Sequence, residues 1–176
     1  CRIEGLVERV AELGQTSCAL TDHGVMYGVI DFYRACKAKG IHPVIGCEVY
    51  LAPHSRFERS YVNGEWHSHL ILLCENMTGY RNLIHMVSLG FSEGFYMKPR
   101  IDMDLLRQHS EGLICLSACL AGVIPRALAE GDMDGAYELC EQFLDIFDRD
   151  HFYLEVQDHG IEVQKKVNEG LYQLAK

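Results

Sequence analysis

The feature that most constrains the fold is a repeated change of hydrophobic period along the chain. Short apolar runs predict strands at 17–20, 44–51, 69–74, 113–116 and 152–156. Helical spacing of apolar residues predicts helices at 2–13, 30–39, 78–89, 103–109, 133–147 and 161–176. Strands that alternate with helices are joined by crossovers, so the pattern predicts an α/β fold with a mainly parallel sheet. Periodicity alone leaves open whether the sheet is doubly wound or a barrel.

Length and charge narrow the class of protein. The chain has 176 residues and a formal net charge of −9. It is long enough for one domain with a core, and its apolar runs are too short to cross a bilayer. An acidic domain is a poor nucleic-acid binder by itself, because phosphates must be neutralised. The chain opens Cys-Arg-Ile-Glu, without an initiator Met or the apolar region of a signal peptide, and we expect it to be a piece of a longer protein.

The eight cysteines do not predict a disulfide framework. Most of them lie inside apolar strand-like or helix-like runs, whereas small secreted domains place cysteines in loops. No Cys-x-x-Cys pair is present, which argues against a zinc ribbon. We therefore expect buried thiols and a cytoplasmic location.

Polar side chains gather where the predicted strands end. In parallel α/β folds, function collects at the carboxyl ends of the strands. Glu48 interrupts an otherwise apolar strand, and a buried glutamate needs a partner such as a metal ion. The other polar residues near strand ends are Asp22, His23, His67, His69, Cys119 and His159.

Imidazole, carboxylate and thiolate groups at one edge are ligands for a divalent metal. Each residue alone has a simpler interpretation. Asp22 and His23 could form a turn and a helix cap, Glu48 could pair with a basic residue, His69 could be a hydrogen-bonded strand histidine, and Cys119 could be a small buried hydrophobe. Mixed nitrogen and oxygen ligands suit zinc, manganese or iron, and a thiolate ligand would favour zinc.

Several runs, taken in order, resemble the PHP (polymerase and histidinol phosphatase) domain of bacterial DNA polymerase III alpha subunits. The first is Ala-Leu-Thr-Asp-His-Gly at 19–24, and the second is Gly-Ile-His-Pro-Val-Ile-Gly-Cys-Glu-Val-Tyr-Leu at 40–51. The others lie at 69–74, 79–83, 94–102, 116–122 and 153–160. The resemblance covers essentially the whole chain.

The resemblance implies a distorted (β/α)7 barrel with a cluster of up to three metals at its carboxyl-terminal rim. By motif, His23, Glu48, His69 and Cys119 match ligand positions, with Glu48 as the bridging carboxylate. Asp22 is expected to shape its loop. His67 and His159 match no ligand position.

The family pattern also implies that this barrel is incomplete. Its first strand, with a His-x-His motif, would precede Cys1, and its last strand, with an Asp-x-His motif, would follow Lys176. We therefore expect residues 1–176 to be a PHP domain fragment.

The activity implied is metal-dependent phosphoester hydrolysis of the 3′–5′ exonuclease type, with His23, Glu48 and His69 as catalytic residues. Lys98 and Arg100 could border the path of the phosphate, although a solvated loop is the preferred interpretation of both. Expected partners are DNA, through the full-length polymerase, and other replisome subunits, with no membrane. A stand-alone phosphatase of the histidinol phosphatase type and a non-catalytic structural module remain the alternatives.

Overall fold

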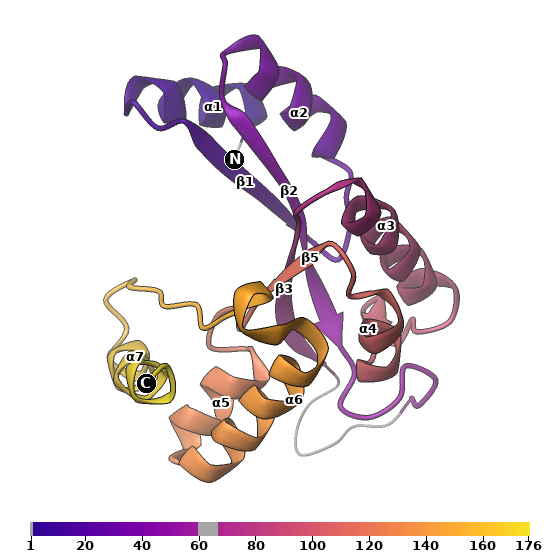
Figure 1. Ribbon diagram of the computed structural model, residues 1–176, viewed down its shortest axis with the longest axis vertical. Coiled ribbons are helices and arrows are strands. Elements are labelled where there is room, and N and C mark those ends of the chain that lie inside the picture. The colour runs from indigo at the N-terminus through magenta and orange to yellow at the C-terminus, as the bar shows by residue number, and fades with distance from the viewer. Residues whose placement is uncertain (1, 60–66) are drawn as a thin grey trace.

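The computed structural model describes residues 2–59 and 67–176. Most of the second half of the polar stretch at 53–66, between the strands predicted at 44–51 and 69–74, lies outside the described residues. Within this part of the chain are seven helices and six strands (Figure 1). The strands are β1 (Ser17–His23), β2 (His42–Leu51), β3 (Ser68–Cys74), β4 (Arg100–Ile101), β5 (Leu113–Leu116) and β6 (Phe152–Tyr153). The helices are α1 (Ile3–Glu12), α2 (Val29–Ala38), α3 (Met77–Ser92), α4 (Met103–His109), α5 (Val123–Glu130), α6 (Met133–His151) and α7 (Glu162–Leu174).

The strands form one open sheet in the order β1-β2-β3-β5-β6, and the short β4 pairs with the end of β2. The pairs β1–β2, β2–β4 and β5–β6 are parallel. Within the described residues β1 and β6 are the two outer strands of this order, and the sheet does not close. The α/β class and the incomplete barrel predicted from the sequence therefore describe the sheet correctly.

Strand β3 departs from the parallel arrangement that the sequence pattern predicted. It runs antiparallel to both of its neighbours, β2 and β5. The described part of the connection from β2, residues 52–59 and 67, contains no helix. Antiparallel neighbours need no crossover helix, whereas parallel neighbours do.

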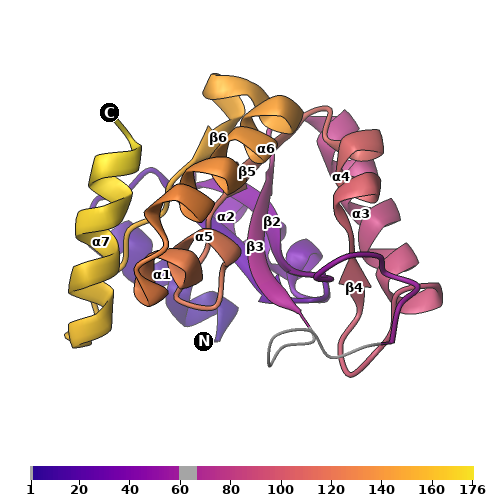
Figure 2. The same cartoon turned by 90° about the horizontal axis from the view of Figure 1, so that it is seen from below.

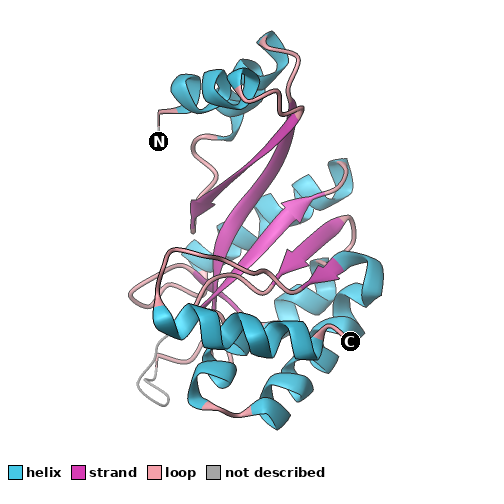
Figure 3. Ribbon diagram, turned by 90° about the vertical axis from the view of Figure 1, so that its left-hand side faces the viewer, coloured by secondary structure: helices cyan, strands magenta, loops and turns pink. Residues whose placement is uncertain are grey.

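Helices cover the sheet in two groups, and each group encloses apolar side chains. Helices α1 and α2 lie together beside the first residues of β1 and β2, over a small cluster that includes Val7, Phe32 and Cys36 (Figure 3). The larger core lies between the central strands and α3 to α7 (Figure 2), and its fully buried members include Leu72, Leu83, Leu106 and Phe143. None of the described helices has the length and apolar character needed to span a membrane.

The sequence analysis did not predict two elements, strand β4 and helix α5. Strand β4 has only two residues, too few for a periodic pattern. Helix α5 contains Pro125, which argues against a helix interior, but this proline lies in the first turn, where its missing N–H costs nothing. The helix ends at Gly131, whose φ of 87° suits the left-handed position after a helix.

Candidate metal site at the edge of the sheet

Glu48 is the centre of the candidate site. It lies in β2 with only 8% of its surface exposed. In the parallel register His23 of β1 is its partner, and in the antiparallel register His69 of β3 lies opposite Tyr50, two residues further along β2. Directly paired residues share a face of the sheet, as do residues two apart on one strand. His23, Glu48 and His69 therefore all project from the same face.

One carboxylate oxygen of Glu48 faces both imidazoles. Its Oε1 atom lies 2.5 Å from Nδ1 of His23 and 3.2 Å from Nδ1 of His69. The side chain of His23 is 72% exposed, whereas that of His69 is 22% exposed. Two of the histidines predicted to bind metal thus meet at one oxygen atom of Glu48, and the group opens to solvent on the His23 side.

Cys119 joins this group from the loop between β5 and α5. Its Sγ atom lies 3.5 Å from Nδ1 of His69. The loop turns sharply at Ala118, which is buried and has a φ of 63°, a conformation that costs free energy for a residue with a Cβ atom. Gly122 allows the turn to close, since a Cβ atom there would lie 2.2 Å from the carbonyl oxygen of Ser117. The N–H of His69 donates to the carbonyl of Ala121, which fixes the loop against β3.

The remaining candidates have different places. Asp22 shapes its loop, as expected: its Oδ2 atom accepts a hydrogen bond from the N–H of Gly28. His67 is close to the site, and its ring stacks on that of His69 with centroids 5.8 Å apart. His159 is exposed and contacts the side chain of Gln164 instead.

The two basic residues flanking Pro99 differ in their exposure to solvent. Lys98 is exposed, as a residue of a solvated loop would be, and lies over the ring of Tyr50. For Arg100 the solvated-loop interpretation is wrong, because only 1% of the residue is exposed. Its guanidinium donates to the carbonyl oxygens of Gly94, Arg56 and Glu58, so it anchors chain segments rather than facing a ligand.

Burial sets the protonation state of the inner histidines. Desolvation lowers the pKa of His69, Glu48 opposes this effect, and the positive charges of His23 and Lys98 add to it. Desolvation also lowers the pKa of His67, and the charges of His69 and Lys98 lower it further. The lowered pKa values favour the neutral form of both imidazoles, and the neutral form is the one that binds a metal.

The side chains as they stand do not form a ready-made cage. Within residues 2–59 and 67–176, no group of three or more His, Cys, Asp or Glu side chains is arranged around a common point that could hold a metal ion. Instead, the imidazole Nδ1 atoms point directly at the carboxylate. The chemistry of the set nevertheless suits a divalent cation, because it combines a buried carboxylate with nitrogen and sulfur ligands.

Two buried polar atoms near these residues support the same conclusion. Among the described residues, Nδ1 of His67 and Oε2 of Glu155 have no hydrogen-bond partner. Such atoms are rare because burial without a partner costs free energy. A bound cation with its solvent would supply partners in this region, so the residues present fit a metal centre.

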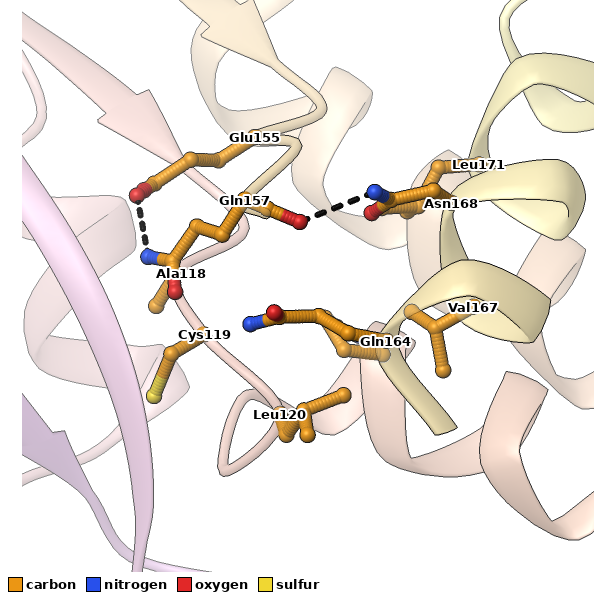
Figure 4. A pocket seen from close by; sticks show the side chains of 10 residues that line it. Ala118, Cys119, Leu120, Glu155, Gln157, Gln164, Val167, Asn168 and Leu171 are labelled. Atoms are coloured by element: carbon orange, nitrogen blue, oxygen red, sulfur yellow. Dashed lines mark hydrogen bonds between the residues drawn. The ribbon is translucent and has the colours of Figure 1, made fainter. Parts of the chain in front are cut away.

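Glu155 was missed in the sequence analysis. It lines a small cavity of about 10 Å³, space for about one water molecule, between the Cys119 loop, the segment after β6 and helix α7 (Figure 4). Figure 4 shows its carboxylate and the sulfur of Cys119 on the same side of this cavity. Its Oε1 atom accepts a hydrogen bond from the side chain of Gln157. The available signal was a glutamate inside the apolar run predicted as a strand at 152–156, the same kind of signal that Glu48 gives.

Comparison with known proteins assigns the family. A family model described as the PHP domain matches residues 1–159. The chain belongs to this family. Among curated relatives, the DNA polymerase III subunit alpha of Treponema pallidum is 48% identical over 174 residues, which is 98% of this chain and 15% of that protein. The Thermus aquaticus protein of the same name is 44% identical over 160 residues, 90% of this chain and 13% of that protein. This PHP domain thus spans about one seventh of the length of such relatives.

A solved structure supports the fold of the PHP domain. The crystal structure of a protein of Bifidobacterium adolescentis, named as a metal-dependent phosphoesterase, superposes with a TM-score of 0.58. The match covers 98% of this chain and 78% of that protein, at 11% sequence identity. At this identity the likeness is one of fold, and it agrees with the incomplete barrel described above.

Proposed function

We propose that residues 1–176 are a PHP domain fragment of a bacterial DNA polymerase III alpha subunit, and that the domain hydrolyses phosphoesters in a metal-dependent reaction of the 3′–5′ exonuclease type. The observation that carries this proposal is the convergence of His23 and His69 on the buried carboxylate of Glu48, with Cys119 in contact with His69.

In this proposal His23, Glu48, His69 and Cys119 hold the metal, and the first three are the catalytic residues. A bound divalent cation would activate water and stabilise the charge that develops on the phosphoryl oxygens. The buried carboxylate of Glu48 gives the site the negative charge that attracts the cation, and the neutral ring of His69 offers a lone pair without deprotonation. The sulfur of Cys119 favours zinc, and manganese is the alternative.

The wider role follows from the relatives. Proteins named DNA polymerase III subunit alpha are much longer than this chain, so the proposed DNA-directed polymerase activity lies in segments other than these 176 residues. DNA and other replisome subunits are the proposed partners, and the cytoplasm is the proposed location. The small share of each relative that the chain spans disfavours a stand-alone phosphatase.

The test uses the intact polypeptide that carries this chain. Metal content is measured by elemental analysis after dialysis, and 3′–5′ degradation of single-stranded DNA is measured without deoxynucleotides. We expect bound zinc or manganese in the wild type. We expect the Glu48→Gln variant, which keeps the size of the side chain and loses its charge, to lose at least one metal and the nuclease activity.

One structural observation favours a second candidate, a non-catalytic module. The absence of a preformed three-ligand cage among the described residues is what a scaffold without a metal would show. In that case the wild type would bind no metal, and Glu48→Gln would leave thermal stability unchanged or raised. Wild-type protein without stoichiometric metal would therefore refute the catalytic proposal.

A further inference from the structure

Lys98 is presented by a strained turn beside the candidate site. The N–H of Tyr96 donates to the carbonyl of Lys98, which closes the turn over Met97. Met97 has a φ of 63°, an unfavourable conformation for a residue with a side chain. Backbone strain of this kind persists only where the surroundings impose it. The direction in which the chain enters Lys98 is thus fixed by the fold.

Close packing fixes the turn against the site. A Cβ atom on Gly24, the neighbour of His23, would lie 2.6 Å from the ring of Tyr50 and 3.2 Å from the ring of Pro99. Gly24 has a φ of 70°, so both its conformation and the available space exclude larger residues. The end of β1, the ring of Tyr50 and the residue after Lys98 therefore form one packed unit.

The ammonium group of Lys98 lies over the ring of Tyr50, which borders the candidate site. Its Nζ atom lies 5.2 Å from the centroid of the Tyr50 ring. On β2, Tyr50 follows Glu48 by two residues and projects from the same face of the sheet, and its ring makes edge contacts with His67 and His69, at centroid distances of 4.8 and 5.4 Å. The charge of Lys98 reaches both imidazoles, since it contributes to lowering the pKa of each.

Lys98 has no carboxylate partner among the residues that the structure describes, although the chain is acidic. Lys39 pairs with Glu8 and Lys165 pairs with Glu162, which is the usual arrangement on such a surface. An ammonium group that lacks a carboxylate counter-ion within residues 2–59 and 67–176, beside a proposed phosphoesterase site, partly offsets the repulsion that a net charge of −9 exerts on an approaching anion.

We propose that Lys98 is a substrate-binding residue that holds a phosphoryl oxygen of the substrate at the Glu48 site. This inference rests on the proposed function and adds to it the residue that recognises the phosphate. Lysine suits the role because its ammonium group is a compact charge with three donors on a flexible stem. The cation–π contact with Tyr50 holds the group near the site without neutralising it.

The experiment measures phosphate binding to the intact polypeptide by calorimetry, in zinc-loaded and zinc-free form. The probes are inorganic phosphate and a dinucleoside monophosphate, which represent a terminal phosphate and a phosphodiester. The variants are Lys98→Met and Lys98→Arg. Lys37→Met is the matched control, because Lys37 also lies over a tyrosine ring, that of Tyr33 at 5.9 Å, but on α2.

We expect Lys98→Met to weaken binding of the preferred probe roughly ten- to one-hundred-fold, the usual effect of removing a hydrogen bond to a charged group. Zinc content stays unchanged, Lys98→Arg retains most of the binding, and Lys37→Met binds like the wild type. The probe that loses affinity identifies the phosphate as terminal or internal.

A second measurement does not depend on the metal. Acetylation of Lys98, followed by mass spectrometry, is expected to slow when inorganic phosphate is present, whereas acetylation of Lys37 does not. Unchanged phosphate affinity in Lys98→Met, together with no protection of Lys98, would overturn the inference while leaving the metal site intact. Absence of zinc from the wild type would instead refute the proposed function, and protection of Lys98 in zinc-free protein would still support the phosphate contact.

Discussion

Arg100→Met tests whether the hydrogen bonds of the buried guanidinium stabilise the chain segments that they join. Methionine keeps an unbranched apolar stem and removes the donors. The Arg100 guanidinium donates to the carbonyl oxygens of Gly94, Arg56 and Glu58, at 3.1, 3.3 and 2.6 Å. Each such bond contributes about 1 kcal/mol net, so their loss should lower the free energy of unfolding by roughly 3 kcal/mol.

The assay is urea unfolding of the 176-residue chain, followed by circular dichroism, together with a thermal melt. A loss of about 3 kcal/mol corresponds to a fall in Tm of roughly 6–12 °C for a chain of this size. Arg107→Met is the control, because Arg107 makes only an exposed pair with Asp104, and its removal should cost less than about 0.5 kcal/mol. If Arg100→Met cost no more than Arg107→Met, Arg100 would be a solvated residue after all and the argument from its hydrogen bonds would be wrong.

Three further predictions concern other parts of the chain. Gly79→Ala should lower the free energy of unfolding by about 3 kcal/mol, because the added Cβ atom would lie 1.7 Å from the carbonyl oxygen of Gly112. Helix propensity alone predicts the opposite sign, and urea unfolding decides between the two. Cys119 should react with iodoacetamide at pH 8, and zinc should protect it. Cys47 should stay unmodified, because it is buried and burial raises its pKa to about 12. Mass spectrometry of the alkylated peptides measures both reactions. Neighbouring carboxylates, Asp148 first, raise the pKa of His151. Its contribution to stability is therefore present below its unfolded-state pKa of about 6.5 and is lost as pH rises through the higher folded-state pKa. In thermal melts across this pH range, the Tm of His151→Asn should depend less on pH than that of the wild type.

Local sequence patterns predicted most of the elements. Helix α4 and strand β5 have the predicted bounds, and the other predicted elements differ at their ends by a few residues. Strand β1 extends to His23, so the Asp22-His23 pair lies at the end of a strand rather than in the loop after it. This extension comes from pairing with β2, a tertiary contact that a local pattern does not contain.

The site was predicted less completely, for a physical reason. His23, Glu48, His69 and Cys119 were predicted by residue type and family motif, and the structure brings them together. The position of Glu155 in its cavity and the position of Lys98 over the ring of Tyr50 depend on segments that are distant in the sequence. The burial of Arg100 also depends on carbonyl groups far away in the sequence, which no spacing rule reveals.

The direction of β3 decides whether the site can exist at all. His69 is the second residue of this strand, and a parallel strand would place it at the edge opposite the end of β2. Seven residues of strand span roughly 20 Å, far beyond the reach of two ligands of one metal ion. In the observed antiparallel register His69 lies opposite Tyr50, and its Nδ1 atom comes within 3.2 Å of Glu48. The four predicted residues lie near one another because β3 runs antiparallel to β2, so that its first residues, rather than its last, meet the carboxyl ends of β1 and β2.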